Sequence, residues 1–159
     1  MDEQNVLTSD VFERIEAELR GFRQLAKARG VLLVNRSGQL FGQAGDTSRM
    51  DTTALAALVA SNVAASRAIA DLVGEREFKG VFLEGDREHI HISLVGSGTI
   101  LAVLFDSQTS LGLVRLRVKS TAKALDDLLR AKAQRVVHDD PVLSPFAEIT
   151  EEDIDQLFR

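Results

Sequence analysis

Apolar residues recur at helical spacing near the start of the chain. Asp10 with Glu13 three residues later resembles a capping box, and Gly30 is a suitable stop signal. Spacings of three and four place the apolar residues on one helical face. These residues are Val11, Ile15, Leu19, Phe22 and Ala26. The pattern predicts a helix from about Thr8 to Ala28.

Short apolar or alternating runs, separated by turn residues, predict five strands. The last run, Ile100 to Phe105, is apolar throughout, as expected for a central strand that is covered on both faces. Tight turns at Asn35–Gly38, Gly85–Arg87 and Gly96–Gly98 favour antiparallel neighbours. The expected strands are Val31–Val34, Gln39–Ala44, Lys79–Glu84, Glu88–Val95 and Thr99–Phe105.

Two longer helices complete the predicted fold. One begins at Asp51 and ends before Gly74. The other is ambiguous at first, since residues 111–118 also alternate like a strand, but the helical spacing continues for several turns and favours a helix over about 109–134. The order helix-strand-strand-helix-strand-strand-strand-helix predicts an α/β (α+β) domain over residues 1–135. Its antiparallel sheet has about five strands, with helices on both faces. Residues 136–159, with both prolines, are expected to form a linker and a tail.

The middle helix has an unusual composition. One stripe is suited to packing on a sheet, with Leu58 on its flank: Leu55, Val59, Asn62, Ser66, Ile69 and Val73. The opposite side carries small residues where a surface helix normally carries charges: Ala54, Ala57, Ser61, Ala64 and Ala68. Alanine could simply favour the helix, or this side could be buried within the domain. We favour a third interpretation, in which another chain covers the small side, making the helix both a dimer element and a docking surface.

Composition and charge narrow the class of protein. The 159 residues include no Cys, Trp or Tyr, which excludes disulfides, thiolate chemistry and zinc ribbons. We expect no apolar run to approach the roughly 18 residues of a membrane span, and therefore expect a cytoplasmic protein. Seven acids and one base from Asp139 to Arg159 give that segment a charge of −6, so the rest of the chain carries +1 of the total −5. Neither part has a basic footprint for nucleic acid.

Motifs of catalysis are missing from the sequence. It has no phosphate-binding loop, metalloprotease motif or nucleophile elbow, so we expect neither an enzyme nor a cofactor. His89 and His91 have acceptable metal-ligand spacing, but His138 is too far along the chain to be an obvious third ligand. The more common interpretation is two half-exposed strand residues; a small-ligand sensor is the alternative. A basic stretch, Arg115 to Lys123, is typical of an exposed helix face.

The tail has an amphipathic pattern of its own. Thr150 with Asp153 again resembles a capping box, and acids surround a set of apolar residues. Those apolar residues are Phe146, Ile149, Ile154, Leu157 and Phe158. So short a helix is marginal alone. The tail is therefore either frayed or, as we prefer, a segment that folds on a basic partner surface.

Several runs resemble a known family. The element order resembles the Roadblock (dynein light chain) domain family, and within it the MglB-type bacterial polarity regulators of the Ras-like GTPase MglA. The similar runs are Gly38–Leu40, Asp51–Ser66, Phe105–Lys119 and Ser144–Phe158. The resemblance implies a GTPase-activating protein, itself not an enzyme, that is cytoplasmic and concentrated at a cell pole. A Roadblock scaffold that binds a small GTPase without stimulating hydrolysis is the alternative.

The resemblance also implies particular surfaces. A homodimer would form at the third strand, around Phe78 to Glu84, with two protomers binding one MglA-like GTPase. The implied dimer residues are Ala54, Ala57, Ser61, Phe78, Val81 and Phe82. The implied GTPase-binding residues are Ala57, Ser61, Ala64, Arg67 and Ala68, together with the apolar residues of the tail, which in this family is thought to favour nucleotide exchange. The GTPase supplies its own catalytic Arg and Gln; Arg67 as an inserted arginine finger is the less favoured alternative.

Overall fold

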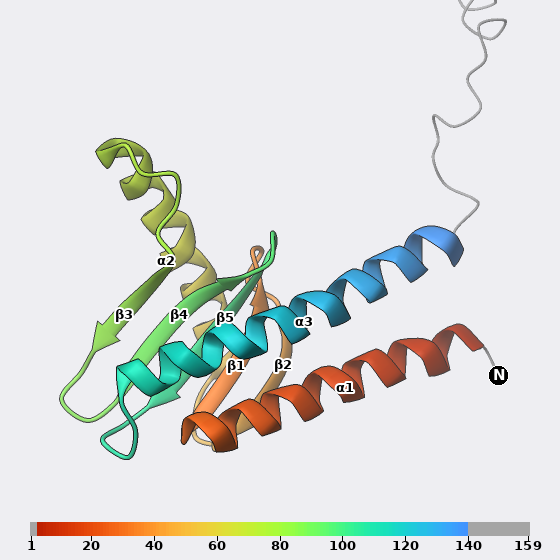
Figure 1. Ribbon diagram of the computed structural model, residues 1–159, viewed down its shortest axis with the longest axis horizontal. Helices are drawn as coiled ribbons and strands as arrows, with labels where there is room; N and C mark the ends of the chain where they lie inside the picture. Colours follow the sequence, from red (N-terminus) through yellow and green to blue (C-terminus); the bar gives the residue numbers. More distant parts are fainter. Residues whose placement is uncertain (1–2, 140–159) are drawn as a thin grey trace, which may run out of the picture.

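The computed structural model describes residues 3–139 of the chain (Figure 1). Its element order is the predicted one. The helices are α1 (Glu3–Ala26), α2 (Thr52–Val73) and α3 (Leu111–Asp139). The strands are β1 (Gly30–Asn35), β2 (Leu40–Gly45), β3 (Gly80–Glu84), β4 (His89–Val95) and β5 (Thr99–Phe105).

The five strands form one antiparallel sheet in the order β2-β1-β5-β4-β3. The central strand β5 is buried at all seven positions, as its continuous apolar sequence predicts. The edge strand β3 is mostly exposed or half-buried. The sheet therefore has a covered centre and an open edge at β3.

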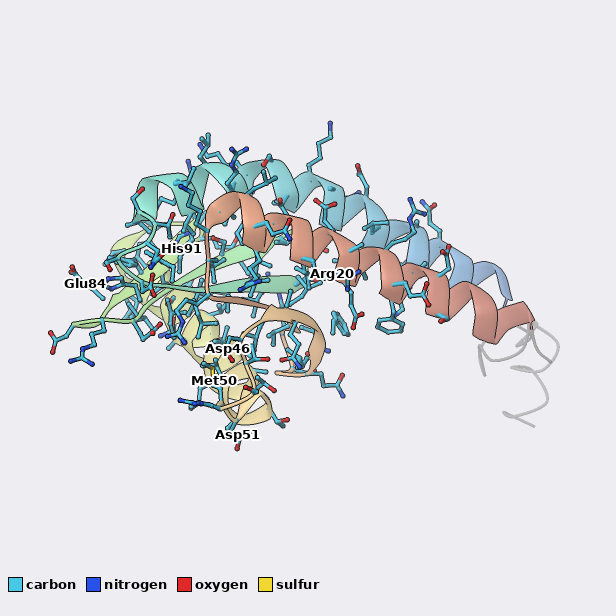
Figure 2. All side chains as sticks on the ribbon, turned by 90° about the horizontal axis from the view of Figure 1, so that it is seen from below. Arg20, Asp46, Met50, Asp51, Glu84 and His91 are labelled. Atoms are coloured by element: carbon cyan, nitrogen blue, oxygen red, sulfur yellow. The ribbon has the colours of Figure 1, made fainter. Side chains whose placement is uncertain are left out.

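Helices cover both faces of the sheet, which confirms the predicted layering. Because side chains alternate along a strand, Val31 and Leu33 of β1 pack with α1 and α3, whereas Leu32 and Val34 pack with α2. Figure 2 shows α1 and α3 on one side of the sheet and α2 on the other.

The outer helices are longer than their apolar patterns predict. Helix α1 begins at Glu3 rather than near Thr8, and α3 continues to Asp139 rather than ending near Gln134. The two helices run side by side beyond the sheet (Figures 1 and 2). The Lys132 ammonium lies 4.2 Å from the centroid of the Phe12 ring and 5.4 Å from that of Phe41. This contact joins α1 and α3 near the β2 edge of the sheet.

Helix α2 has the predicted ends. The Asp51 carboxylate accepts a hydrogen bond from the Ala54 amide at 3.0 Å, which satisfies one of the free N–H groups of the first turn. Gly74 ends the helix with φ of +77°, a left-handed conformation that glycine adopts at little cost.

By length and composition, α2 is also apolar enough to cross a membrane. The expectation that no apolar run approaches a membrane span is wrong by that criterion. In the fold, however, Ala56, Val59 and Ala60 of this helix are buried against the sheet. Packing against the sheet therefore explains the apolar residues on one side of α2. The apolar residues on its outer side require another explanation.

Candidate partner-binding surface

The outer side of α2 is exposed along its whole length. The five small residues singled out in the sequence, Ala54, Ala57, Ser61, Ala64 and Ala68, are all exposed in the chain. The Ser61 hydroxyl donates to the Ala57 carbonyl at 2.9 Å, so its polarity is largely satisfied within the helix. The structure thus excludes burial of this side within the domain and leaves a smooth face with little polarity.

The stripe expected to face the sheet is only partly correct. Val59 is buried, but Leu58, Ile69 and Val73 are 67%, 53% and 64% exposed. Ala56, Ala60 and Ala70 are buried in addition to Val59. A 22-residue helix is about 33 Å long, whereas a seven-residue strand spans about 23 Å. The last turns of α2 therefore extend past the sheet (Figure 1).

Sequence reasoning missed an apolar patch at this extended end. Leu72 is 87% exposed and lies beside Val73, with Ile69 one turn earlier. Ile69, Leu72 and Val73 form the α2 apolar patch; Leu58, also exposed, lies about 21 Å earlier along the helix. Large exposed apolar patches mark interaction sites more often than chance. Comparing the length of the helix with the length of the strands could have revealed this patch from sequence.

The edge strand β3 offers a second open surface. It pairs with β4 on one side, and within the described residues no strand pairs with its other side. Such an edge presents unpaired N–H and C=O groups to another strand. Of the predicted dimer residues, Phe78 is 37% exposed, while Val81 and Phe82 are half-buried. Val81 packs on the α2 side and Phe82 on the α1–α3 side, where its ring stacks on Phe105 with centroids 6.0 Å apart.

The two surfaces meet at a narrow cleft between α2 and the start of β3. Val63, Ser66 and Arg67 line it from the helix, and Phe78 and Val81 line it from the strand segment. The Arg67 side chain is exposed, and it forms no salt bridge with the side chains described for residues 9–134. The structure therefore brings Arg67 together with two of the predicted dimer residues.

The first half of the helix lies elsewhere. A Cβ atom on Gly38, in the turn between β1 and β2, would lie 3.0 Å from the Cα atom of Ala57. Ala57 is thus positioned by the hairpin turn rather than by β3. The predicted dimer residues fall into two groups, one beside the hairpin and one at the β3 edge.

The two strand histidines lie in different environments. His91 is only 4% exposed, so its description as half-exposed is wrong, whereas His89 is half-buried. The His91 Nε2 atom lies 2.8 Å from the Ser93 hydroxyl, and its Nδ1 atom is buried with no hydrogen-bond partner. Burial, and secondarily the charge of Arg115, lower the pKa of His91 below its ordinary value of 6.5.

Within the part of the chain that the structure describes, no three potential ligand residues gather to hold a metal ion. The predicted tail residues Phe146, Ile149, Ile154, Leu157 and Phe158 lie outside the described residues.

The sequence and the fold match known proteins. Residues 14–105 match the Roadblock/LC7 domain family. The structure of Myxococcus xanthus MglB is 43% identical over 76% of this chain and 90% of its own, with a TM-score of 0.72. A gliding protein MglB from Thermus thermophilus is 30% identical over 74% of this chain and 90% of its own, with a TM-score of 0.69. An MglB with tetrameric arrangement is 31% identical over 74% and 89%, with a TM-score of 0.70.

No curated protein sequence matches the chain. The family match covers more than half of the chain and spans α1 to β5, and the three MglB structures extend the similarity beyond it. The chain therefore belongs to the Roadblock/LC7 domain family.

Proposed function

We propose that the protein is a homodimeric GTPase-activating protein for a Ras-like small GTPase of the MglA type, in the control of bacterial cell polarity or motility. The observation that carries the proposal is the exposed outer side of α2, small along most of its length and apolar at its end. Similarity to MglB structures of 30 to 43% identity supports the choice of partner.

The geometry favours a dimer built at β3. Pairing of two β3 edges would join two five-stranded sheets into one and satisfy the open backbone groups. Because the end of α2 lies beside the start of β3, this pairing would bring two α2 helices close together. Their outer sides would then form one platform for a single GTPase.

The chemistry of the platform favours positioning over direct catalysis. Between Thr52 and Val73, Arg67 is the only cation and Asp71 the only acid. Phosphoryl transfer depends on orientation and charge stabilisation, and a correctly held arginine of the GTPase itself can supply the charge. A smooth, nearly uncharged helix face is suited to holding the GTPase's mobile segments in the active arrangement. Arg67 as an inserted finger is the less favoured mechanism.

The test is GTP hydrolysis with a variant of the docking face. Replacing both Ala64→Arg and Ala68→Arg places two long charged side chains on the platform, so it should abolish stimulated hydrolysis while the dimer persists in light scattering. The matched control carries Ala17→Arg on α1 and Ala133→Arg on α3, which are also exposed helical alanines, and should stimulate like the wild type. Undiminished stimulation by the α2 variant would contradict the proposed docking face.

A scaffold is the competing function. One fold serves many functions, so a Roadblock domain can bind a GTPase without changing its rate. In that case the α2 variant would lose binding, yet wild-type protein would leave hydrolysis unchanged.

A further inference from the structure

A groove at the β3 edge, mainly on the α1–α3 face of the sheet, has a cationic lining that the docking surface does not explain. It runs between the second and third turns of α3 and the β3–β4 pair, and it shares Phe78 and Leu94 with the cleft beside α2. Phe78, Leu94, Val118 and Ala122 give it apolar walls. His91 and Ser93 lie among them, with the buried Nδ1 atom of His91 lacking a partner. Figure 2 shows His91 beside α3.

The rim of the groove is cationic. Lys79 lines it from the strand side, and Arg115 and Lys119 line it from α3. Lys123 continues the helical row one turn further, so Arg115, Lys119 and Lys123 form the α3 cationic row, with like charges at four-residue spacing. Such spacing destabilises a helix slightly unless an anion lies nearby.

Neighbouring acids leave these cations unneutralised. Glu77 lines the groove, but its carboxylate lies 3.6 Å from Arg36. Asp126, on α3 beside Gly96, accepts a hydrogen bond from Arg130 at 2.8 Å. Within the described residues, Lys79 and the α3 cationic row form no salt bridges. The lowered pKa of His91, to which Arg115 contributes, is consistent with a positive local field.

The chain itself contains a segment that complements this groove. Residues 139–159 carry seven acids and one base, with seven large apolar residues among them. Apolar side chains could enter the groove while acids meet its rim. This pattern requires an occupant that is both acidic and amphipathic, which distinguishes it from a small inorganic anion.

The tail is long enough to reach. From Asp139 back to Lys119 is twenty residues of helix, or about 30 Å. The twenty residues from 140 to 159 could span up to roughly 66 Å when extended. About half of the tail can therefore cover the distance and leave the rest to bind.

We propose that the acidic end of the tail, residues 149–158, docks in the groove between α3 and the β3–β4 edge of its own chain when no partner is bound. The tail then has two competing sites, this groove and a partner's surface. Docking in the groove does not depend on whether the protein activates a GTPase.

The test uses the absence of cysteine from the chain. A nitroxide on Gln156→Cys, the single cysteine, broadens amide signals of nearby residues in NMR spectra of the full chain without any GTPase. Chains that carry both the nitroxide and the NMR isotope are mixed with an excess of chains that carry neither. In this mixture, the observed broadening comes from the tail of the same chain. We expect loss of amide peak intensity at Lys79, Leu94, Arg115 and Lys119, reduced at high salt. Broadening limited to the end of α3, or lost on dilution, would overturn the proposal.

Charge reversal makes the test specific. Arg115→Glu with Lys119→Glu should abolish the broadening in the groove, whereas Arg14→Glu with Arg49→Glu, exposed cations outside the groove, should preserve it. Adding Glu151→Arg, Glu152→Arg and Asp155→Arg to the groove variant should restore it. Persistent broadening in the groove variant, or failure of the tail reversal to restore it, would contradict docking by charge complementarity.

Discussion

The turn between β1 and β2 packs closely against α2, and replacing its glycine tests this contact directly. Gly38 has φ of +87°, and a Cβ atom there would lie 3.0 Å from the Cα of Ala57 and 3.6 Å from its Cβ. Gly38→Ala therefore incurs two costs. The left-handed conformation costs a residue with a side chain about 1–2 kcal/mol, and the contact with helix backbone, which cannot rotate away, costs about 1–3 kcal/mol as overpacking.

Gly74→Ala is the matched control. Gly74 has φ of +77°, but a Cβ there would meet nothing within 4 Å. It should therefore lose only the conformational part, about 1–2 kcal/mol. Gly38→Ala should lose about 2–5 kcal/mol in total, which a domain with roughly 5–15 kcal/mol of stability tolerates.

The measurement is urea unfolding of both variants at one fixed protein concentration, since association adds to apparent stability. Equal losses for the two variants would show that the turn does not contact α2 as described. A larger loss at Gly74 would contradict the reasoning altogether.

Four further outcomes follow from the structure. Arg67→Ala should leave the maximal stimulated hydrolysis rate nearly unchanged, and a loss of about 10³-fold or more, the scale of a missing finger, would reverse the proposed mechanism. Leu72→Ser with Val73→Ser should weaken dimerisation or GTPase binding, measured by light scattering and titration, while unfolding stability stays within about 0.5 kcal/mol because both side chains are exposed; unchanged association would remove the α2 apolar patch from the interface. Because the folded pKa of His91 is lowered from 6.5, the unfolded chain binds more protons just below that pH, so unfolding free energy should fall as pH decreases through 6.5; His91→Gln should flatten this dependence, and an identical pH profile would refute the assignment. Truncation after Pro145 should keep the thermal transition but weaken GTPase binding in a salt-dependent way, and unchanged affinity would exclude the tail as an anchor.

Local chemistry made much of the fold predictable. The ends of α2 were readable because Asp51 and Gly74 satisfy specific backbone groups at those positions. The central position of β5 was predictable from its uninterrupted apolar sequence. A strand that is covered on both faces carries apolar residues at successive positions, whereas a strand with one exposed face alternates. The outer limits of α1 and α3 were not readable, because the apolar periodicity that marks a helix packed on the core does not extend to its last turns.

The candidate surface was only partly predictable. Periodicity located the small side of α2 correctly, since it depends on the helix alone. It placed Ile69 and Val73 against the sheet, because periodicity carries no information about where the sheet ends. The burial of His91 has a similar origin: α3 covers β4, and α3 begins only at Leu111, after another strand has intervened.

The most direct test of the account is single-turnover GTP hydrolysis by the MglA-type GTPase, measured with and without a saturating amount of the full chain. The account predicts a clearly faster rate with the chain present, with the increase lost in the Ala64→Arg and Ala68→Arg variant. The same rate with and without the chain, despite formation of a complex, would contradict activation and leave the protein a scaffold.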